Sequence, residues 1–477
     1  MHRHNLHSVG VEVVVGSGLN LARDPERGVR NSKITGRVKM TGPSLELRHR
    51  PQELDLMNDA SVPQPNGAPS DRKDIFEKCW KFNRARALQE AGLYIYFETF
   101  GGREGCGPSE MTLGDRKILM FGSNDYLDLT WDPRVKEAAA AAIHKYGTGC
   151  SGSRLLNGTL PIHVQLEEEL AEFMGKEEAI VFGTGFQANY ATIAALASEG
   201  ELILCEHNLH ASLVDGALRS SARTMRYRHN DMQHLEKRLQ QANGEGVLIV
   251  SESVFSMEGD VADLRAVTSL ARKYGARTYV DEAHGLGIFG PTGAGVAEEQ
   301  GVLKDVDVVM GTFSKSLAAA GGFIAATEPV VHYLKHLAQP FVFSASVPPA
   351  SVEAVRCALR ILRTEPERRH RLLRIADLIR RELAALGFSV IDGNSPVVAV
   401  VIPDEIMLFQ MARELLEEGI YVNGVARPAA TQNLIRISCT AAHTEAHAWR
   451  LVEVMERLAK RLNLELEKPA KAARLAL

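Results

Sequence analysis

Two short runs of residues constrain the fold of this chain more than any other feature. Residues 276–280 (ARTYV) and 306–312 (VDVVMGT) are rich in β-branched, aromatic and other apolar side chains. Runs of this length and composition are typical of buried parallel strands. They predict an open α/β sheet, in which ligands bind at the carboxyl ends of the strands.

An acid and a lysine follow these two runs. Asp281 comes directly after the first run, and Lys315 comes shortly after Thr312, the last residue of the second. Because parallel strands end at the same edge of a sheet, both side chains are expected in one cleft. The alternative is an ordinary strand-to-helix turn that carries a surface lysine.

The cofactor pyridoxal phosphate (PLP) needs these two groups. A lysine amine forms its Schiff base, and a carboxylate beside its ring nitrogen keeps the ring an electron sink. Lys315 and Asp281 suit these roles. The hydroxyl groups of Thr312 and Ser314 could bind the phosphate, together with backbone N–H groups.

Five motifs extend this interpretation along the chain. In chain order they are GSNDYLDL, GCSGSRLLNGTLPIH, HASLVDG, DEAHGLGIFGPTGAG and GTFSKS. They resemble the motifs of the α-oxoamine synthases, which are fold-type I PLP enzymes that condense an amino acid with an acyl thioester. The resemblance spans residues 74–464. It implies an α/β fold with a mostly parallel central sheet, plus a smaller α+β C-terminal domain.

The resemblance also assigns roles to individual residues. It implies that Lys315, His210, Asp281 and His284 are catalytic. His210 would stack on the cofactor ring, whereas Ser256 and His284 would lie near its phenolic oxygen. Taken alone, His210 would instead be interpreted as a hydrogen-bonded loop histidine. The implied cofactor contacts are Lys315, Thr184, Gly185, Phe186, His210, Ser256, Asp281, His284, Thr312, Ser314, Ser344 and Ala345.

Binding of the substrate and of a second subunit is likewise implied. Asn124, His210 and Arg427 are expected to contact the amino acid, and Arg436 is a second candidate for its carboxylate. In the family, the residues that match Ser344 and Ala345 come from the neighbouring subunit and complete the phosphate site, which implies a homodimer. The chain departs from the family at Asp128, where glycine is usual, so a different turn is expected there.

Within the family, the segments around GCSGSRLLNGTL and HNDMQHLEKRL are most similar to the bacterial serine palmitoyltransferases. This implies that L-serine and palmitoyl-CoA give 3-ketosphinganine, CoA and CO2. The loop between Arg427 and Arg436 is shorter than in those enzymes, which leaves the substrate length open. Alternatives are a synthase that uses glycine, alanine or an acyl-carrier-protein thioester, and an aminotransferase or aldolase on the same fold. A non-catalytic partner subunit would be expected to lack Lys315.

Composition narrows the class of protein further. The 55 basic and 59 acidic residues give a net charge of −4, which argues against a nucleic-acid partner. The six cysteines are scattered without metal-binding spacing, and they predict reduced thiols in a cytoplasmic protein with no metal. No apolar run approaches the ~20 residues of a membrane span, so the acyl substrate would be met in solution or by peripheral contact with a membrane.

The organisation of the chain follows from these patterns. Residues 1–73 predict a disordered extension, with Met40 or Met57 as possible starts. Residues 74–119 predict an arm and a strand pair formed by residues 93–100 and 111–121, with a turn at Gly114-Asp115. A large cofactor domain is expected over residues 120–348, and within it residues 318–328 predict a return strand at the edge of the sheet. An α+β domain over residues 349–466 and a tail over residues 467–477 follow.

Overall fold

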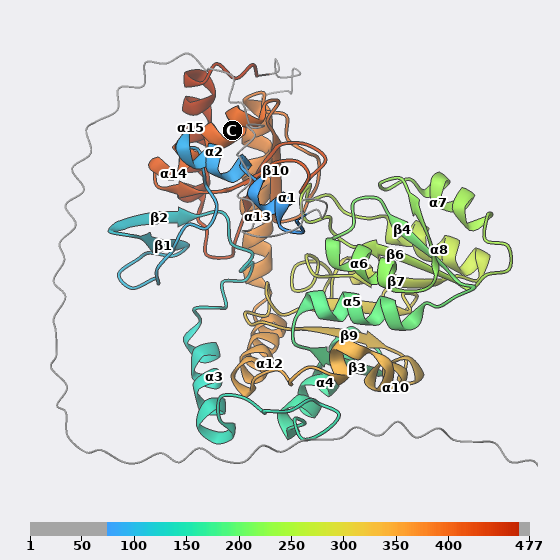
Figure 1. Cartoon of the computed structure of the whole chain (residues 1–477). Coiled ribbons are helices and arrows are strands. Elements are labelled where there is room, and N and C mark those ends of the chain that lie inside the picture. The colour runs from blue at the N-terminus through green and yellow to red at the C-terminus, as the bar shows by residue number, and fades with distance from the viewer. Residues whose placement is uncertain (1–73, 467–477) are drawn as a thin grey trace, which may run out of the picture. The chain divides into compact units, whose positions relative to one another are not determined.

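A seven-stranded sheet is the main element of the fold (Figure 1), for which the computed structural model describes residues 74–466. All of its strands run in one direction except β9, which is antiparallel to both neighbours. This confirms the predicted α/β fold with a mostly parallel sheet. In spatial order the strands are β3 (Glu178–Phe182), β9 (Gly322–Ala326), β8 (Val308–Thr312), β7 (Arg277–Asp281), β6 (Val247–Glu252), β4 (Leu202–Glu206) and β5 (Arg223–Tyr227).

Helices cover both faces of this sheet, which explains why its inner strands are apolar on both sides. One face packs against α5 (Gly185–Leu196), α6 (Ala211–Arg219), α10 (Glu328–Leu337) and α11 (Gln339–Val342). The other face packs against α4 (Pro161–Met174), α7 (Met232–Leu239) and α8 (Leu264–Tyr274). The result is a three-layer sandwich in which the carboxyl ends of the parallel strands share one edge.

The C-terminal part has its own antiparallel sheet, as the α+β interpretation predicted. It contains β10 (Val397–Val401), β13 (Leu434–Ser438) and β12 (Asn423–Val425), in that order. Three helices accompany it, namely α13 (Glu367–Ala385), α14 (Glu405–Glu417) and α15 (Glu445–Arg461). The remaining helices are α1 (Glu77–Trp80), α2 (Arg84–Glu90), α3 (Pro133–Tyr146), α9 (Val296–Glu299) and α12 (Pro349–Thr364).

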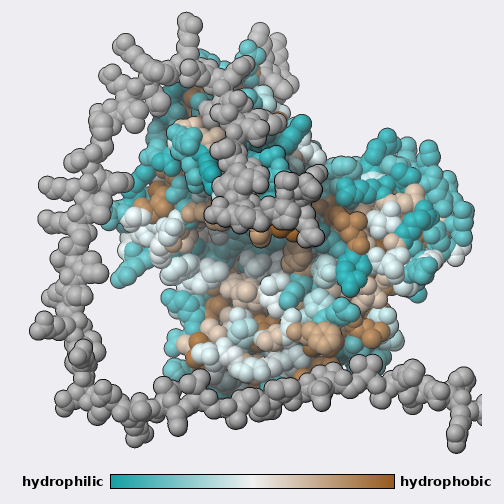
Figure 2. All heavy atoms as spheres, in the orientation of Figure 1, coloured by the Kyte–Doolittle hydropathy of each residue, from teal (hydrophilic) through white to brown (hydrophobic). Residues whose placement is uncertain are grey.

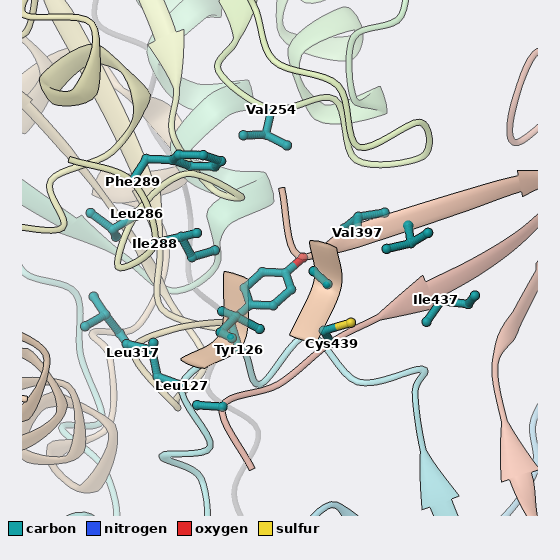
Figure 3. Close-up of a cluster of buried hydrophobic side chains, with 14 of the residues drawn as sticks. Tyr126, Leu127, Val254, Leu286, Ile288, Phe289, Leu317, Val397, Ile437 and Cys439 are labelled. Atoms are coloured by element: carbon teal, nitrogen blue, oxygen red, sulfur yellow. The ribbon is translucent and has the colours of Figure 1, made fainter. Parts of the chain in front are cut away.

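A third small sheet joins the two ends of the described chain. Strands β1 (Glu110–Leu113) and β2 (Arg116–Met120) form a hairpin with the predicted turn at Gly114-Asp115, although residues 111–121 were predicted as one strand. Strand β11 (Ile420–Tyr421) pairs with β2 in parallel. The hydrophobic core also extends from the central sheet to the C-terminal sheet. Figure 3 shows Tyr126 among Leu286 and Leu317, which follow β7 and β8, and Val397 and Ile437 of the C-terminal sheet.

Residues 93–100 do not form the predicted strand. Only Phe100 makes a single bridge, to Leu113. The aromatic side chains of this segment are anchored separately instead. The Tyr96 hydroxyl donates to the Gly424 carbonyl at 3.1 Å, and Phe97 has a left-handed φ of 58° that interrupts an extended backbone. The apolar and aromatic residues of this segment therefore serve to anchor it, at Tyr96, to the C-terminal part, and they do not form a sheet.

The predicted return strand is present as β9, but its predicted place at the sheet edge is wrong. Strand β9 lies between β3 and β8, and all five of its residues are buried. A strand buried on both faces and hydrogen-bonded on both sides is interior. Strand β3 takes the edge.

Side chains and a glycine at the helix ends fix where α3 and α4 begin and where α3 stops. Asp132 caps α3 by accepting from the Arg134 N–H at 3.0 Å, and Gly147 ends this helix with a φ of 83°. His163 caps the start of α4 by accepting from the Leu160 N–H, and it is fully buried. Asp128 adopts a left-handed φ of 55°, a conformation that suits glycine, and it pairs with Arg103.

The predictions for residues 1–73 and 467–477 concern residues outside the described part of the chain, and the domain boundaries at residues 120 and 349 stay predictions. Among residues 74–466, no helix combines the length and apolarity that a membrane crossing needs.

Candidate active site

A cavity of about 350 Å³ opens at the carboxyl edge of the central sheet. It is lined by residues that follow four different strands and by the start of α5, as expected for an open α/β sheet. The lining residues are Thr184, Gly185, Phe186, Asn189, His210, Ser212, Glu252, Asp281, Ala283, His284, Met310, Thr312, Ser314, Lys315, Ala320 and Gly321. The structure thus brings together most of the residues that the sequence singled out.

Asp281 ends β7 and is held by two donors. The Asn189 side-chain amide donates to Oδ2 at 2.7 Å, and the Ala283 backbone N–H donates to Oδ1 at 2.8 Å. Asn189 is itself oriented by the Tyr279 hydroxyl, which donates to its Oδ1 at 2.7 Å. Each carboxylate oxygen of Asp281 therefore has a fixed hydrogen-bond partner.

Lys315 follows β8 and reaches the same cavity. Burial lowers the pKa of its amine to about 8, although the negative charge of Asp281 opposes this shift. A substantial fraction of Lys315 is therefore neutral near pH 8. A neutral amine is the form that can attack an aldehyde and accept a proton.

His210 is the N-cap of α6 and is tied to Asp281 by a chain of hydrogen bonds. Asn189 donates to the Ser212 hydroxyl oxygen at 2.9 Å, and this hydroxyl contacts His210 Nδ1 at 2.7 Å. Because the Ser212 backbone N–H also donates to Nδ1, this nitrogen acts as an acceptor. The Nε2 atom of neutral His210 then carries the proton.

His284 is buried at the inner side of the cavity. Its Nδ1 lies 2.7 Å from the hydroxyl of Tyr126, which is fully buried. Burial lowers the pKa of His284 well below its usual value, and the nearby Lys315 and Arg436 add to this effect. His284 is therefore a neutral imidazole, suited to hydrogen bonding rather than to carrying charge.

One end of the cavity is suited to a phosphate group. Thr184 caps α5 by accepting from the Gln187 N–H at 3.0 Å, so the helix start faces the cavity with its partial positive charge. Across from it, the hydroxyl groups of Thr312 and Ser314 lie 3.0 Å apart. A Cβ atom on Gly185 would come within 2.8 Å of the Thr312 hydroxyl oxygen, so only glycine allows this close approach.

Arg436 and Asn124 lie close together behind His284. Arg436 is 5 % exposed, and both of its terminal nitrogens lie 3.3 Å from Asn124 Oδ1. Its Nε donates to the Ser256 carbonyl at 2.7 Å. Asn124, Ser256 and Arg436 are outside the lining of the cavity, although Asn124 also contacts the Tyr126 hydroxyl at 3.4 Å.

Three further predicted residues lie away from the cavity of their own chain. Arg427 is exposed, and its Nε donates to the Thr431 carbonyl at 3.0 Å within the same loop. Ser344 and Ala345 line a small neighbouring recess, where Gln187 Nε2 lies 3.3 Å from the Ser344 hydroxyl oxygen. Their expected contact with a second subunit stays a prediction.

Sequence reasoning missed three residues of this site. Tyr126 was inside a quoted motif, and Asn189 lies one turn after the phosphate-binding loop. Glu252 ends β6 and lies directly opposite Asp281 on the neighbouring strand. A search for polar residues at the ends of all predicted strands would have found Glu252. Among the described residues, no group of three or more histidine, cysteine or acidic side chains is arranged to hold a metal.

Comparisons with known proteins agree with this geometry. Residues 116–455 match the family of class I and II aminotransferases. The chain is 43 % identical to a serine palmitoyltransferase of Bacteroides ovatus, over 81 % of this chain and 98 % of that protein. It is also 43 % identical to a putative 8-amino-7-oxononanoate synthase 2 of Mycobacterium tuberculosis, over 82 % of this chain and 50 % of that protein.

A solved structure of serine palmitoyltransferase with its PLP internal aldimine is similar in fold. It superposes with a TM-score of 0.79 at 34 % identity, over 82 % of this chain and all of that chain. Since the family model matches residues 116–455 and the Bacteroides relative is 43 % identical over 98 % of its own length, the chain belongs to the class I and II aminotransferase family and, within it, to the PLP-dependent α-oxoamine synthases.

Proposed function

We propose that this chain condenses L-serine with a long-chain acyl-CoA, with palmitoyl-CoA as the favoured donor, and releases CoA and CO2. The product would be a 3-keto sphingoid base, so the reaction would begin sphingolipid synthesis. The observation that carries the proposal is the meeting of Asp281 and Lys315 in one cavity beside two neutral histidines.

The residues of the cavity suit PLP. When bound, PLP supplies an aldehyde that condenses with amines and a pyridinium ring that accepts an electron pair. The ionised Asp281 would hold the proton on the ring nitrogen. The α5 N-terminus with Thr184, and the hydroxyls of Thr312 and Ser314, would hold the phosphate.

Lys315 and His210 would act on the amino acid. The neutral Nζ of Lys315 would take the proton from the substrate Cα, since burial brings its pKa to about 8. His210 would cover the ring and offer its Nε2–H to the substrate carboxylate. Arg427 and Arg436 remain the two candidates for an ion pair with this carboxylate.

The choice of serine rests on relatives alone. The Bacteroides protein carries the name serine palmitoyltransferase, but a relative of equal identity carries the name of a different synthase. A synthase that uses glycine or alanine, or an acyl-carrier-protein thioester, is therefore the second candidate. An aminotransferase on the same fold is the third candidate, because it would use the same lysine and aspartate.

A homodimer and a cytoplasmic location belong to the same proposal. The six cysteines are all free, which agrees with a reducing compartment. The exposed side chain of Phe343 lies next to Ser344 and Ala345, which the family resemblance assigns to the phosphate site of the neighbouring subunit.

The test uses the purified enzyme loaded with PLP. Amino acids are added one at a time while the absorbance of bound PLP is recorded, and acyl-CoA thioesters of increasing length are then added while thiol release is measured. We expect the largest spectral change with L-serine and the fastest thiol release with C16 chains. Glycine or alanine strongly exceeding serine would refute the substrate choice. Transfer of the amino group to a keto acid without thiol release would favour the aminotransferase.

A further inference from the structure

A second carboxyl group lies beside Asp281 and has no role in the proposed reaction. Glu252 is the last residue of β6, and it is in register with Asp281 on the adjacent parallel strand β7. Residues in register on neighbouring parallel strands point to the same face, and both side chains line the cavity. Glu252 is 3 % exposed and Asp281 is 4 % exposed, so neither is well solvated.

The two carboxyl groups have unequal hydrogen bonds. Asp281 accepts from a donor on each of its oxygens, namely Asn189 Nδ2 and the Ala283 N–H. Within residues 74–466, the carboxyl group of Glu252 accepts only from the backbone N–H of His210, through Oε1. Two negative charges repel each other in an enclosed site. The carboxyl group that accepts more hydrogen bonds is therefore the one that keeps its charge. The geometry therefore favours an ionised Asp281 and a neutral Glu252.

The other ionisable groups around Glu252 support this assignment. Asp281 on β7 and Glu206 at the end of β4 are negative neighbours, whereas Lys315 after β8 is the nearby amine. Burial raises the pKa of Glu252 well above its usual value, and the charge of Asp281 raises it further. The hydrogen bond from His210 and the charge of Lys315 act in the opposite direction but are weaker.

We propose that Glu252 is a positioning residue that stays protonated at neutral pH. It acts in two ways. Its Oε1 anchors the backbone N–H of His210, which fixes the loop between β4 and α6 and the start of that helix. Its neutral state reserves the single negative charge of the pair for Asp281, the residue that faces the cofactor's ring nitrogen in the proposed function.

This neutral state has a consequence for Lys315. A second negative charge in the cavity would stabilise the ammonium form of Lys315, which cannot attack an aldehyde. A protonated Glu252 adds no such charge, so it leaves the lysine amine free to react. This consequence for Lys315 rests on the proposed PLP chemistry, but the direct test of the protonation of Glu252 does not need the cofactor.

The direct test is infrared spectroscopy of the cofactor-free protein at pH 7. A protonated carboxylic acid has a carbonyl stretch that is separate from the carboxylate bands. The difference spectrum between wild type and Glu252→Gln should contain a lost acid band, and the spectrum for the matched Asp281→Asn variant should contain a lost carboxylate band. A lost carboxylate band in Glu252→Gln would overturn the proposal, even if the enzyme binds PLP as expected.

A second measurement tests both actions through PLP uptake and turnover. The rate of PLP uptake by cofactor-free protein is followed against pH. For Glu252→Gln we expect a midpoint within about half a pH unit of wild type, whereas removal of an ionised neighbour would lower it by about one unit or more. Glu252→Ala removes the acceptor of the His210 N–H, so kcat should fall about 10-fold or more below that of Glu252→Gln. Equal kcat values for the two variants, with unchanged thermal unfolding, would refute the anchoring of His210.

Discussion

Lys315 is placed where burial and charge act against each other. Burial favours the neutral amine, and the carboxylate of Asp281 favours the ammonium ion. Burial is the larger effect, so the pKa falls from 10.5 to about 8. At a pH of about 8, a lysine on the surface would be almost fully protonated and would react slowly.

Replacing this lysine tests the whole assignment. In Lys315→Ala we expect loss of covalently bound PLP and loss of activity by at least about 10³-fold, because no amine remains to hold the cofactor. Mass spectrometry after borohydride reduction measures the bound cofactor. Lys304→Ala, which alters an exposed lysine on the segment before β8, is the control and should label like wild type. Retained covalent PLP in Lys315→Ala would place the attachment on another lysine.

The pH dependence of PLP uptake follows from the same pKa. Because the amine must be neutral, the uptake rate of cofactor-free protein should rise about tenfold per pH unit below pH 8 and become level above it. Asp281→Asn removes a charge that raises the pKa of Lys315, so the midpoint should move to lower pH. A wild-type midpoint near 10.5 would contradict the lowered pKa.

At the scale of elements, the close contact between α5 and β8 shapes the phosphate end of the cavity. Gly185→Ala would place a Cβ atom 2.8 Å from the Thr312 hydroxyl oxygen and 3.1 Å from its Cβ, so the start of α5 must shift. We expect the affinity for PLP to fall about tenfold or more, measured by titration of cofactor-free protein. Gly246→Ala is the control, because a Cβ atom there meets only ordinary contacts of 3.4 Å or more. Unchanged affinity in Gly185→Ala would exclude this end as the phosphate site.

His229 joins the segments that follow three strands. Its Nδ1 and Nε2 each lie 2.9 Å from a carboxylate, those of Glu206 after β4 and Asp260 after β6. Desolvation is the largest single effect and lowers the pKa of His229, but the hydrogen bonds to Asp260 and Glu206 together outweigh it and raise the pKa to about 10. The ring is therefore a cation that holds these segments together, including the one that carries His210.

His229→Leu would leave two carboxylates without their cation. We expect the free energy of unfolding at pH 6.5 to fall by about 2–4 kcal/mol in urea titrations, with little change in the exposed control His332→Leu. A raised pKa in the folded state stabilises fully below 6.5 and is lost as pH rises through 10. The difference between wild type and His229→Leu should shrink over this range. A constant difference would show that packing alone is responsible.

Elements differ in how well they could be predicted. Strands β7 and β8 and the site residues after them follow from local composition, because a buried parallel strand must be apolar throughout. The pairing of β9 with β3, and the anchoring of Tyr96 on Gly424, depend on residues far away in the chain. Strand β5 was missed because four of its five residues are exposed or partly exposed, as on a sheet edge. The hydrogen-bond partners of Glu252 and Asn189 are likewise far away in the chain, so local composition could not predict them.

At the scale of the whole molecule, several large hydrophobic side chains are exposed on the surface. Figure 2 shows hydrophobic patches on the lower half of this view, whereas the end that carries α7 and α8 is mainly hydrophilic. Phe343 is 82 % exposed and Leu156 is 78 % exposed. If the proposed homodimer forms, we expect Phe343, next to Ser344, to be buried against the second copy of the chain.

Mixing of two inactive variants tests whether the subunits share their sites. Lys315→Ala removes the amine, and Ser344→Asp places a negative charge where the neighbour's phosphate would bind. If Ser344 serves the other subunit, half of a randomly mixed population is mixed dimer with one intact site each, which gives about a quarter of wild-type activity. Unfolding and refolding the two variants together exchanges the subunits, and refolding each alone is the control. No recovery in the mixture would contradict a shared site.

The small sheet β1-β2-β11 determines when this enzyme can first become active during synthesis. The Leu119 N–H donates to the Gly419 carbonyl at 2.9 Å, and the Ser438 N–H donates to the Phe121 carbonyl at 2.7 Å. Asn124 likewise accepts a hydrogen bond from Arg436, which comes late in the chain. A growing chain that has left the ribosome only as far as Lys315 already contains the reactive amine, but its first strands have no partners. We therefore expect a chain that is truncated before β13 to lack these contacts and to be inactive.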